Sequence, residues 1–214
     1  MTGAPGKKTR RLSDAGRPYH HGELAAALLD AAGKELAEKG IEGFSLRGVA
    51  KRAGVSHAAP AHHFRDADGL LTALAARGFE RFVARQEAFR RKARPAPREQ
   101  LVASGLGYLA FAIENPALFR LMFGSRRPDF ADGNLSRAAE AAFDDLVVQV
   151  ARVTGKRGPP GRDRSALIDV SAAWALAHGL ADLMVAGRLP YLTDLPEAAR
   201  EQAIAAIIRR ALPP

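Results

Sequence analysis

The histidines of this 214-residue chain invite a metal-binding interpretation, because five of the six lie in adjacent or near pairs. The adjacent pairs are His20-His21 and His62-His63. Neighbouring residues on a helix point about 100° apart, so neither pair chelates a metal ion easily. The chain has no cysteine and no H-E-x-x-H sequence. We therefore predict no metal site and no cofactor.

Catalytic patterns are also missing from the sequence. It shows no nucleophile–base pairing, no paired carboxylates for acid–base work and no glycine loop that could cradle a phosphate. We predict that the protein is not an enzyme. One alternative is a helical enzyme or metal-binding protein that uses His178 with a nearby carboxylate such as Asp182. Unchanged folding of a metal-free preparation would exclude it.

Trp174 and His178 lie four residues apart, and therefore on one face of an expected helix. They are either a buried aromatic residue beside a histidine that bonds a neighbouring carbonyl, or a polar group that orients a ligand in an apolar pocket. Both interpretations stay open. A second set of residues looks like core at helical spacing, yet would also line such a pocket. That set is Tyr108, Phe111, Phe119, Met122 and Phe123.

A net charge of +9 indicates a polyanionic partner. Much of the charge lies in residues 1–21, where the only acidic residue is Asp14. The basic residues there are Lys7, Lys8, Arg10, Arg11 and Arg17. We expect residues 1–18 to be a disordered arm without DNA, and beside a DNA-binding unit it could follow the phosphate backbone or enter the minor groove.

Residues 44–64 have the pattern of two short helices joined by a tight turn. Ser45 is a good N-cap for the first helix, and Gly54 can adopt the positive φ of a sharp reversal. We expect Ser56 to cap a second helix that ends near Phe64. Small Ala50 would let the helices cross closely. This is the arrangement of a helix-turn-helix, whose second helix enters the DNA major groove.

The surface expected to face the groove is small and weakly charged: Ser56, His57, Ala58, Ala61 and His62. It has no Arg or Asn for bidentate contacts to bases. We therefore expect DNA shape, methyl contacts and Arg47 to share the specificity. Ser45, His63 and Arg65 complete the expected DNA-binding set, in which His62 and His63 contact phosphates or base edges. His20 and His21 are expected at the turn that enters the first helix.

Apolar residues at the helical period predict further helices, and no strand-like alternation occurs. We predict an all-α fold of about nine helices: three in the N-terminal unit, a long fourth helix, and a larger helical set behind it. Beside the two short helices, their expected ranges are 23–39, 66–92, 101–113, 116–123, 135–153, 162–187 and 196–211. We expect Asp66 to cap the long fourth helix, Asn115 to cap the helix that starts at Pro116, and loops at 124–133 and 155–161.

Three segments follow from this division: an arm over 1–18, a DNA-binding domain over 19–79 and a helical domain over 80–214. No apolar run of a secretion signal follows the basic arm. The most apolar long stretch, 166–187, carries Asp169, His178 and Asp182, which favours a core helix over a membrane span. We expect a cytoplasmic protein with no membrane partner.

The last two helices offer an apolar surface that could be internal core or a two-fold interface. Its residues are Leu180, Leu183, Met184, Ile204, Ile207 and Ile208. A single small DNA-binding domain contacts one half-site, so two copies are needed to contact two half-sites about 34 Å apart. We therefore expect a homodimer through these two helices.

The chain resembles the TetR family of bacterial transcriptional regulators over its whole length. The motifs that carry the resemblance are Y-H-H-G-E-L at 19–24, S-L-R-G-V-A-K-R-A-G-V-S-H-A-A-P at 45–60, and W-A-L-A-H-G at 174–179. The third is similar to a Trp-His-Gly signature of one subgroup. The resemblance implies a repressor that binds a pseudo-palindromic DNA operator as a homodimer and is released by a small effector bound in the C-terminal domain.

Two positions depart from the family pattern. The family usually has Tyr where this chain has Ala61, and Lys where it has Ala67; both commonly touch phosphates. A regulator with weakened DNA binding that acts through protein contacts is therefore an alternative. The salt dependence of DNA binding would separate the two, since each phosphate contact contributes a slope of about −0.9.

Overall fold

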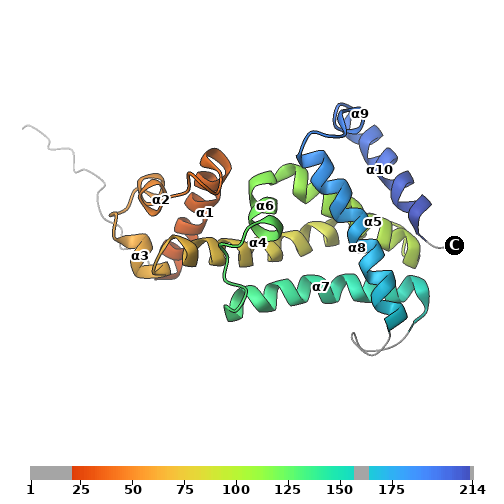
Figure 1. Cartoon of the computed structure of the whole chain (residues 1–214), viewed down its shortest axis with the longest axis horizontal. Helices are drawn as coiled ribbons and strands as arrows, with labels where there is room; N and C mark the ends of the chain where they lie inside the picture. Colours follow the sequence, from red (N-terminus) through yellow and green to blue (C-terminus); the bar gives the residue numbers. More distant parts are fainter. Residues whose placement is uncertain (1–20, 157–163, 213–214) are drawn as a thin grey trace, which may run out of the picture.

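The computed structural model describes residues 21–156 and 164–212, and every regular element in these ranges is a helix. The helices, drawn in Figure 1, are α1 (His21–Lys39), α2 (Leu46–Ala53), α3 (Ala59–Phe64), α4 (Ala67–Arg90), α5 (Pro97–Glu114), α6 (Pro116–Gly124), α7 (Gly133–Thr154), α8 (Arg164–Val185), α9 (Pro190–Thr193) and α10 (Glu197–Ala211). The predicted all-α fold is confirmed. The helix missing from the prediction is α9, whose four residues are too few to show a period. The expected arm at 1–18, His20 and most of the 155–161 loop lie outside the described residues.

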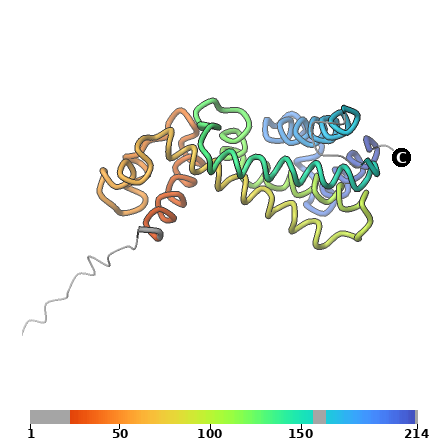
Figure 2. The backbone as a smooth tube through the Cα atoms, turned by 90° about the horizontal axis from the view of Figure 1, so that it is seen from below, coloured from red at the N-terminus to blue at the C-terminus, as the bar shows by residue number. Residues whose placement is uncertain are grey.

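The molecule has a small head and a larger body (Figure 1). The head comprises α1, α2, α3 and the start of α4; the body comprises the rest of α4 and α5 to α10. Helix α4 runs from the head into the body, where α5 and α7 pack along it, as both views of the backbone show (Figure 2). Helix α8 packs against α5 and α7, and α10 covers α5. One long helix therefore connects the two parts.

Local signals place the helix ends of the head. Ser45 Oγ accepts a hydrogen bond of 3.1 Å from the Gly48 N–H, and Gly54 ends α2 with φ of 68°. Asp66 caps α4 by accepting from the Gly69 N–H at 2.8 Å. These three predictions are confirmed, because capping depends on neighbours in the sequence.

The predicted start of the second short helix is wrong. Ser56 does not cap it; α3 begins at Ala59, and its N-terminal residue Ala58 makes no side-chain cap. The Ala59 N–H bonds the Ser56 carbonyl at 3.0 Å in a turn, and buried Pro60 follows in the first turn of the helix. A helix that started at Ser56 would need a hydrogen bond from residue 60, and proline has no N–H. Starting at Ala59 puts Pro60 where no such bond is required.

Asn115 stands before Pro116 as expected, but its side chain does not cap α6. Its amide donates back to the Phe111 carbonyl at 3.0 Å and its oxygen accepts from Arg81 at 3.1 Å. The side chain therefore closes the end of α5 and ties the bend of 109° between α5 and α6 to α4.

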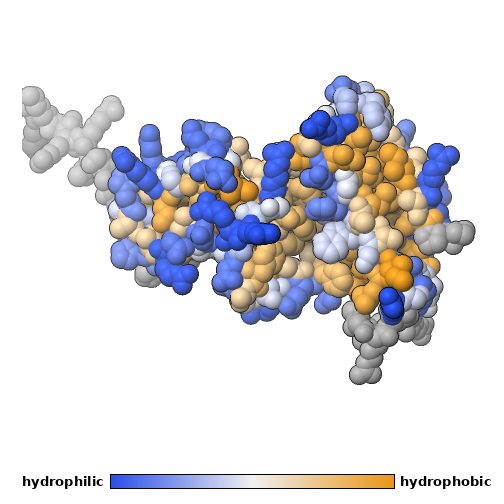
Figure 3. Space-filling model, in the orientation of Figure 1, coloured by the Kyte–Doolittle hydropathy of each residue, from blue (hydrophilic) through white to orange (hydrophobic). Residues whose placement is uncertain are grey.

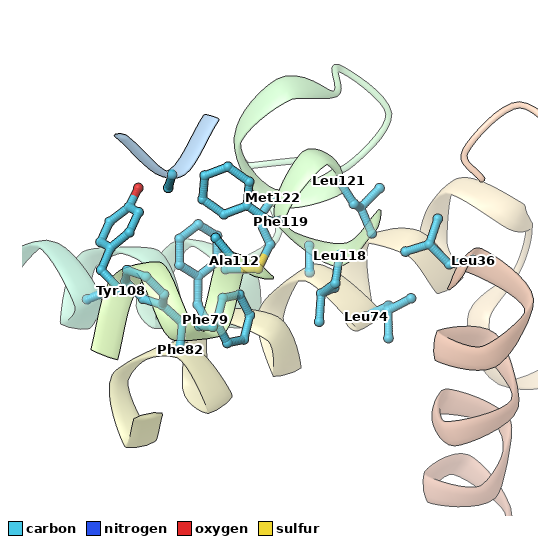
Figure 4. Close-up of a cluster of buried hydrophobic side chains, with 14 of the residues drawn as sticks. Leu36, Leu74, Phe79, Phe82, Tyr108, Ala112, Leu118, Phe119, Leu121 and Met122 are labelled. Carbon is cyan, nitrogen blue, oxygen red and sulfur yellow. The ribbon is translucent and has the colours of Figure 1, made fainter. Parts of the chain in front are cut away.

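The head and the body share one contiguous core. Leu36 of α1 faces Leu74 of α4 and Leu121 of α6, and the cluster continues along α4 through Phe79 and Phe82 towards Tyr108 (Figure 4). The expected domain boundary after residue 79 falls inside the unbroken α4. The head and the body are therefore joined by packed side chains as well as by α4.

Helix α5 crosses α4 at its closest where Gly107 lies over the backbone of Gln86. A Cβ at position 107 would be 2.5 Å from the Gln86 Cα and 3.0 Å from the Arg85 carbonyl oxygen. Glycine is required by this close approach. The crossing fixes the position of Gln86 in the middle of the body.

Candidate DNA-binding surface and ligand cavity

The head is held together by an ion-pair cluster between α1 and α2. Arg52 Nε donates to Glu35 at 2.5 Å, and its Nη2 donates to Glu38. The hydrogen bond to Glu35 raises the pKa of Arg52, and the hydrogen bond from Arg52 lowers the pKa of Glu38. Glu35 is buried directly against Gly48, where an added Cβ would overlap its carboxylate. Arg52 thus serves the packing of the head.

The residues predicted to bind DNA lie at the outer end of the head, on α2, α3 and the turns beside them (Figure 1). His63 is half-buried beside the Phe64 ring, at 6.1 Å between centroids. The others are exposed: Ser45, Arg47, Ser56, His57, Ala58, Ala61, His62 and Arg65. The structure therefore leaves this set accessible to a large partner.

Arg65 lies in an unusual backbone conformation at the junction of α3 and α4. Its φ is 68°, the one positive value found at a non-glycine residue in the described ranges. Its side chain is 88% exposed, with Nε 3.2 Å from the Asp66 carboxylate. The hydrogen bond from the Gly69 N–H lowers the pKa of Asp66, and the hydrogen bond from Arg65 lowers it further by a smaller amount. The sharp turn directs a guanidinium outwards beside α3, where it is available to a phosphate.

Sequence reasoning missed Lys51. It is exposed on α2, four residues after Arg47 and therefore on the same side of the helix. Neither Arg47 nor Lys51 has an ion pair among the described residues, in contrast to Arg52. The spacing of four between two basic residues was the available signal, and only the pairing of Arg52 shows which basic residues of α2 remain free.

The body contains a cavity of about 350 Å³. Such a volume is typical of small-molecule sites. Helices α4, α5, α6, α7, α8 and α10 all contribute to its wall. Seven of the described lining residues are aromatic: Phe79, Phe82, Tyr108, Phe123, Phe130, Phe143 and Trp174.

Four of the seven residues predicted to bind a ligand line this cavity: Tyr108, Met122, Phe123 and Trp174. Phe111 and Phe119 are buried in the core and are not among the lining residues. His178 stands behind the wall, where its Nδ1 and the Tyr108 hydroxyl form a hydrogen bond of 2.7 Å. Burial raises the pKa of the Tyr108 hydroxyl, against an opposing hydrogen bond with Trp174.

Each of the two interpretations of Trp174 and His178 agrees with the structure in part. His178 is satisfied by a tyrosine hydroxyl, where the sequence suggested a backbone carbonyl. Trp174 is 41% exposed and lines the cavity, so it is not the buried aromatic residue of the structural alternative. Their rings lie 6.5 Å apart, centroid to centroid, as expected for residues one turn apart.

The loop between α6 and α7, residues 125–132, contacts both the cavity and the head. Ser125 and Phe130 line the cavity. Between them, Arg127 donates to Asp68 at 2.7 Å and to the Ile41 carbonyl at 3.0 Å. Ile41 lies in the connection between α1 and α2, and Asp68 lies in the first turn of α4. The Asp129 N–H also donates to Thr72 of α4, at 2.9 Å.

The body thus contains an apolar cavity, and the head exposes a helix-turn-helix, an element typical of DNA-binding proteins. Comparison with known families agrees. The family described as "Bacterial regulatory proteins, tetR family" matches residues 28–74, and "Tetracyclin repressor-like, C-terminal domain" matches residues 101–207. The chain belongs to the TetR family of bacterial transcriptional regulators, and it is a DNA-binding transcriptional regulator.

Individual relatives are consistent with this assignment. The chain is 29% identical to the HTH-type transcriptional regulator BetI of Burkholderia cenocepacia (strain HI2424), over 75% of this chain and 93% of that protein. It is 37% identical to a protein of unknown function from Rhodococcus sp. RHA1, with a TM-score of 0.70 over 92% of this chain and 99% of the other. A TetR-like transcriptional regulator from the same organism shares the fold at 18% identity, with a TM-score of 0.60 over 90% and 97% of the two chains.

Proposed function

We propose that this protein is a cytoplasmic repressor without enzymatic activity, which binds a pseudo-palindromic operator as a homodimer and is released when a small molecule enters the body cavity. The observation that carries the proposal is the α6–α7 loop. Ser125 and Phe130 of this loop line the cavity, and Arg127 and Asp129 between them bond the head at Ile41, Asp68 and Thr72. A ligand that displaces Ser125 or Phe130 acts on the position of the head.

Release from DNA requires that the head can take two positions that differ in their affinity for DNA. A dimer presents two heads, and their separation has to match two half-sites one helical turn apart. Both contacts of Arg127 lie close to the DNA-binding helices, because Ile41 precedes α2 and Asp68 follows α3. Loss of these bonds would let the head turn about α4. A small rotation there changes the separation of the two heads.

Helix α8 supports the homodimer. It is the one helix in the described ranges that is long and apolar enough to cross a membrane by itself, yet only 22% of its apolar 18-residue stretch is buried. In Figure 3, apolar surface gathers over α8 and neighbouring α10, whereas polar side chains surround the head. Ile168 is 62% exposed and Leu183 is 43% exposed. An apolar face of this kind requires a cover.

We propose a second copy of the chain as that cover, in place of lipid. Asp169 and Asp182 lie within α8, and α8 packs against α5, α7 and α10. Two charges within the apolar stretch would be costly in a bilayer. Of the residues considered for the interface from sequence, Met184, Ile204 and Ile208 are buried core, whereas Leu183 is available for a partner.

The first test is selection of sheared genomic DNA by the purified protein at near-physiological salt, followed by sequencing. We expect a few enriched sites that contain an inverted repeat. If no site is enriched, with or without candidate ligands, the proposal of operator binding is contradicted. That result would favour a regulator that acts through protein contacts, the alternative suggested by Ala61 and Ala67.

The second test is sedimentation of a Leu183→Glu variant. We expect the dimer to dissociate, because the substitution places a charge in the proposed interface. Val148→Glu is the matched control, since Val148 is 46% exposed and belongs to α7, outside the proposed α8 surface. A monomeric unaltered protein, or equal effects of the two variants, would contradict the α8 interface.

A further inference from the structure

Gln86 is a buried polar residue in the wall of the cavity. It is 7% exposed, and no hydrogen bond to its side-chain amide is found within residues 21–156 and 164–212. The crossing of α5 at Gly107 holds its backbone in place. A buried amide without a partner is unfavourable unless a further molecule supplies one. Its amide can both donate and accept, so it suits a hydroxyl, a carbonyl or an amide.

The other polar lining groups already have partners. Ser104 donates to the Gln100 carbonyl at 3.1 Å and accepts from Arg90 at 3.0 Å. The Tyr108 hydroxyl bonds His178, and Ser125 Oγ accepts from the Arg127 N–H at 3.1 Å. Among the described lining residues, Gln86 is therefore the buried side chain whose polar atoms all await a partner.

No charged side chain occurs among the described residues that line the cavity. The neighbouring pair of Arg90 and Asp145 is closed on itself at 2.7 Å. A buried ligand charge would have no counter-charge there, and its transfer from water would be strongly unfavourable. The charge balance of the wall therefore favours an uncharged ligand.

The volume and the wall limit the ligand further. An apolar cavity of about 150 Å³ accommodates one benzene molecule. The cavity here is about 350 Å³, a little over twice that volume, so two fused rings fit and leave room for about one further ring. The ring faces and edges of Phe79, Phe82, Phe123 and Phe143 can pack against an aromatic ligand in offset or edge-to-face geometry.

We propose that the cavity binds an uncharged aromatic molecule of two or three fused rings, whose single hydrogen-bonding group pairs with the Gln86 amide. This inference rests on the proposed function for its regulatory meaning, but the binding itself does not require DNA.

The test is calorimetric titration of the full chain, without DNA, using probes of one ring system. The probes are 2-naphthol, naphthalene, 2-naphthoate and (2-naphthylmethyl)trimethylammonium, with octan-1-ol as a flexible apolar alcohol. We expect 2-naphthol to bind about tenfold more tightly than naphthalene, because it alone gains the hydrogen bond. We expect the anion, the cation and octan-1-ol to bind more weakly than 2-naphthol. Equal or tighter binding by any of these three, or no binding of 2-naphthol up to its solubility, would overturn the ligand class.

A Gln86→Leu variant tests the anchor. It should lose the roughly tenfold preference for 2-naphthol over naphthalene. Gln149→Leu is the matched control: Gln149 is also buried, at 4% exposed, but lies outside the cavity wall and should keep the preference. A Gln86→Leu protein that retains the preference would overturn the assignment. If the variant does not fold, the comparison of probes on the unaltered protein still decides.

Failure of this inference and failure of the proposed function are distinguishable. Operator binding and its release by some other molecule, together with no binding of 2-naphthol, would leave the repressor intact and reject the ligand class. Tight 2-naphthol binding by a protein that selects no genomic site would do the reverse.

Discussion

The head and the body differ in the pairing of a buried polar side chain: Glu35 of the head is paired with Arg52, whereas Gln86 of the body has no described partner. In the head, polar side chains are paired across helices, as Arg52 is with Glu35 and Glu38, or cap helix ends, as Ser45 and Asp66 do. In the body, six helices surround a cavity in which Gln86 has no described partner. Paired and capped polar side chains hold the head in one conformation, which suits binding to the fixed shape of DNA. A hollow body can be altered by whatever fills it.

The largest expected effect tests whether the body is tightly packed where α5 crosses α4. Gly107→Ala places a Cβ against the Gln86 backbone, which cannot move aside. We expect the free energy of unfolding, measured in urea, to fall by about 2–3 kcal/mol. Gly124→Ala is the control, because its Cβ would meet nothing within 4 Å. Equal stabilities of the two variants would show that the α4–α5 crossing is looser than the structure indicates.

The next largest effect is a change in the stability of the body with pH. The pKa of Tyr108 is raised above its usual value by burial, so above pH 10 the unfolded chain loses a proton that the folded body keeps. Stability from this group is complete below pH 10 and should fall by about 1.4 kcal/mol for each further pH unit. Tyr108→Phe should remove that part of the alkaline slope in thermal unfolding. Tyr191→Phe, at an exposed tyrosine, should leave it unchanged.

A smaller effect tests the connection between the two parts. Arg127→Ala removes the hydrogen bonds from the α6–α7 loop to Asp68 and Ile41. We expect operator affinity without ligand to persist while the ligand-induced change in that affinity shrinks about fivefold, which corresponds to about 1 kcal/mol of coupling. The neighbouring Arg126 is exposed and makes no such bonds, so Arg126→Ala is the control for charge. Full coupling in Arg127→Ala would show that these two hydrogen bonds do not carry it.

The smallest effect concerns the head alone. Arg47→Ala and Lys51→Ala each remove an exposed basic residue from α2. We expect each to reduce the slope of log affinity against log salt by about 0.9, with ligand binding unchanged. Arg91→Ala, at the far end of α4, removes the same charge outside the head. Full operator affinity and an unchanged slope in Arg47→Ala would exclude Arg47 from the DNA contact.

Much of the head could be predicted from the sequence, because its signals are local. The caps at Ser45 and Asp66 and the turn at Gly54 depend on residues within one helical turn. The error at Ser56 was local too: Pro60 four residues later rules out the hydrogen bond that such a start requires. The exposure of most candidate DNA-binding residues follows from the two short helices, and their contact with DNA stays a prediction.

The body shows what only the tertiary structure decided. Gln86 reads as one more polar residue on a long helix, and it becomes a ligand anchor only where α5 crosses at Gly107 and closes the cavity over it. In the sequence, Arg127 is a charged residue in an expected loop. In the fold it contacts Asp68 and Ile41, which are 59 and 86 residues away along the chain. The sequence determined the helices, their caps and the helix-turn-helix, since those energies act within a few residues. The cavity and its link to the head required long-range packing, which no short pattern encodes.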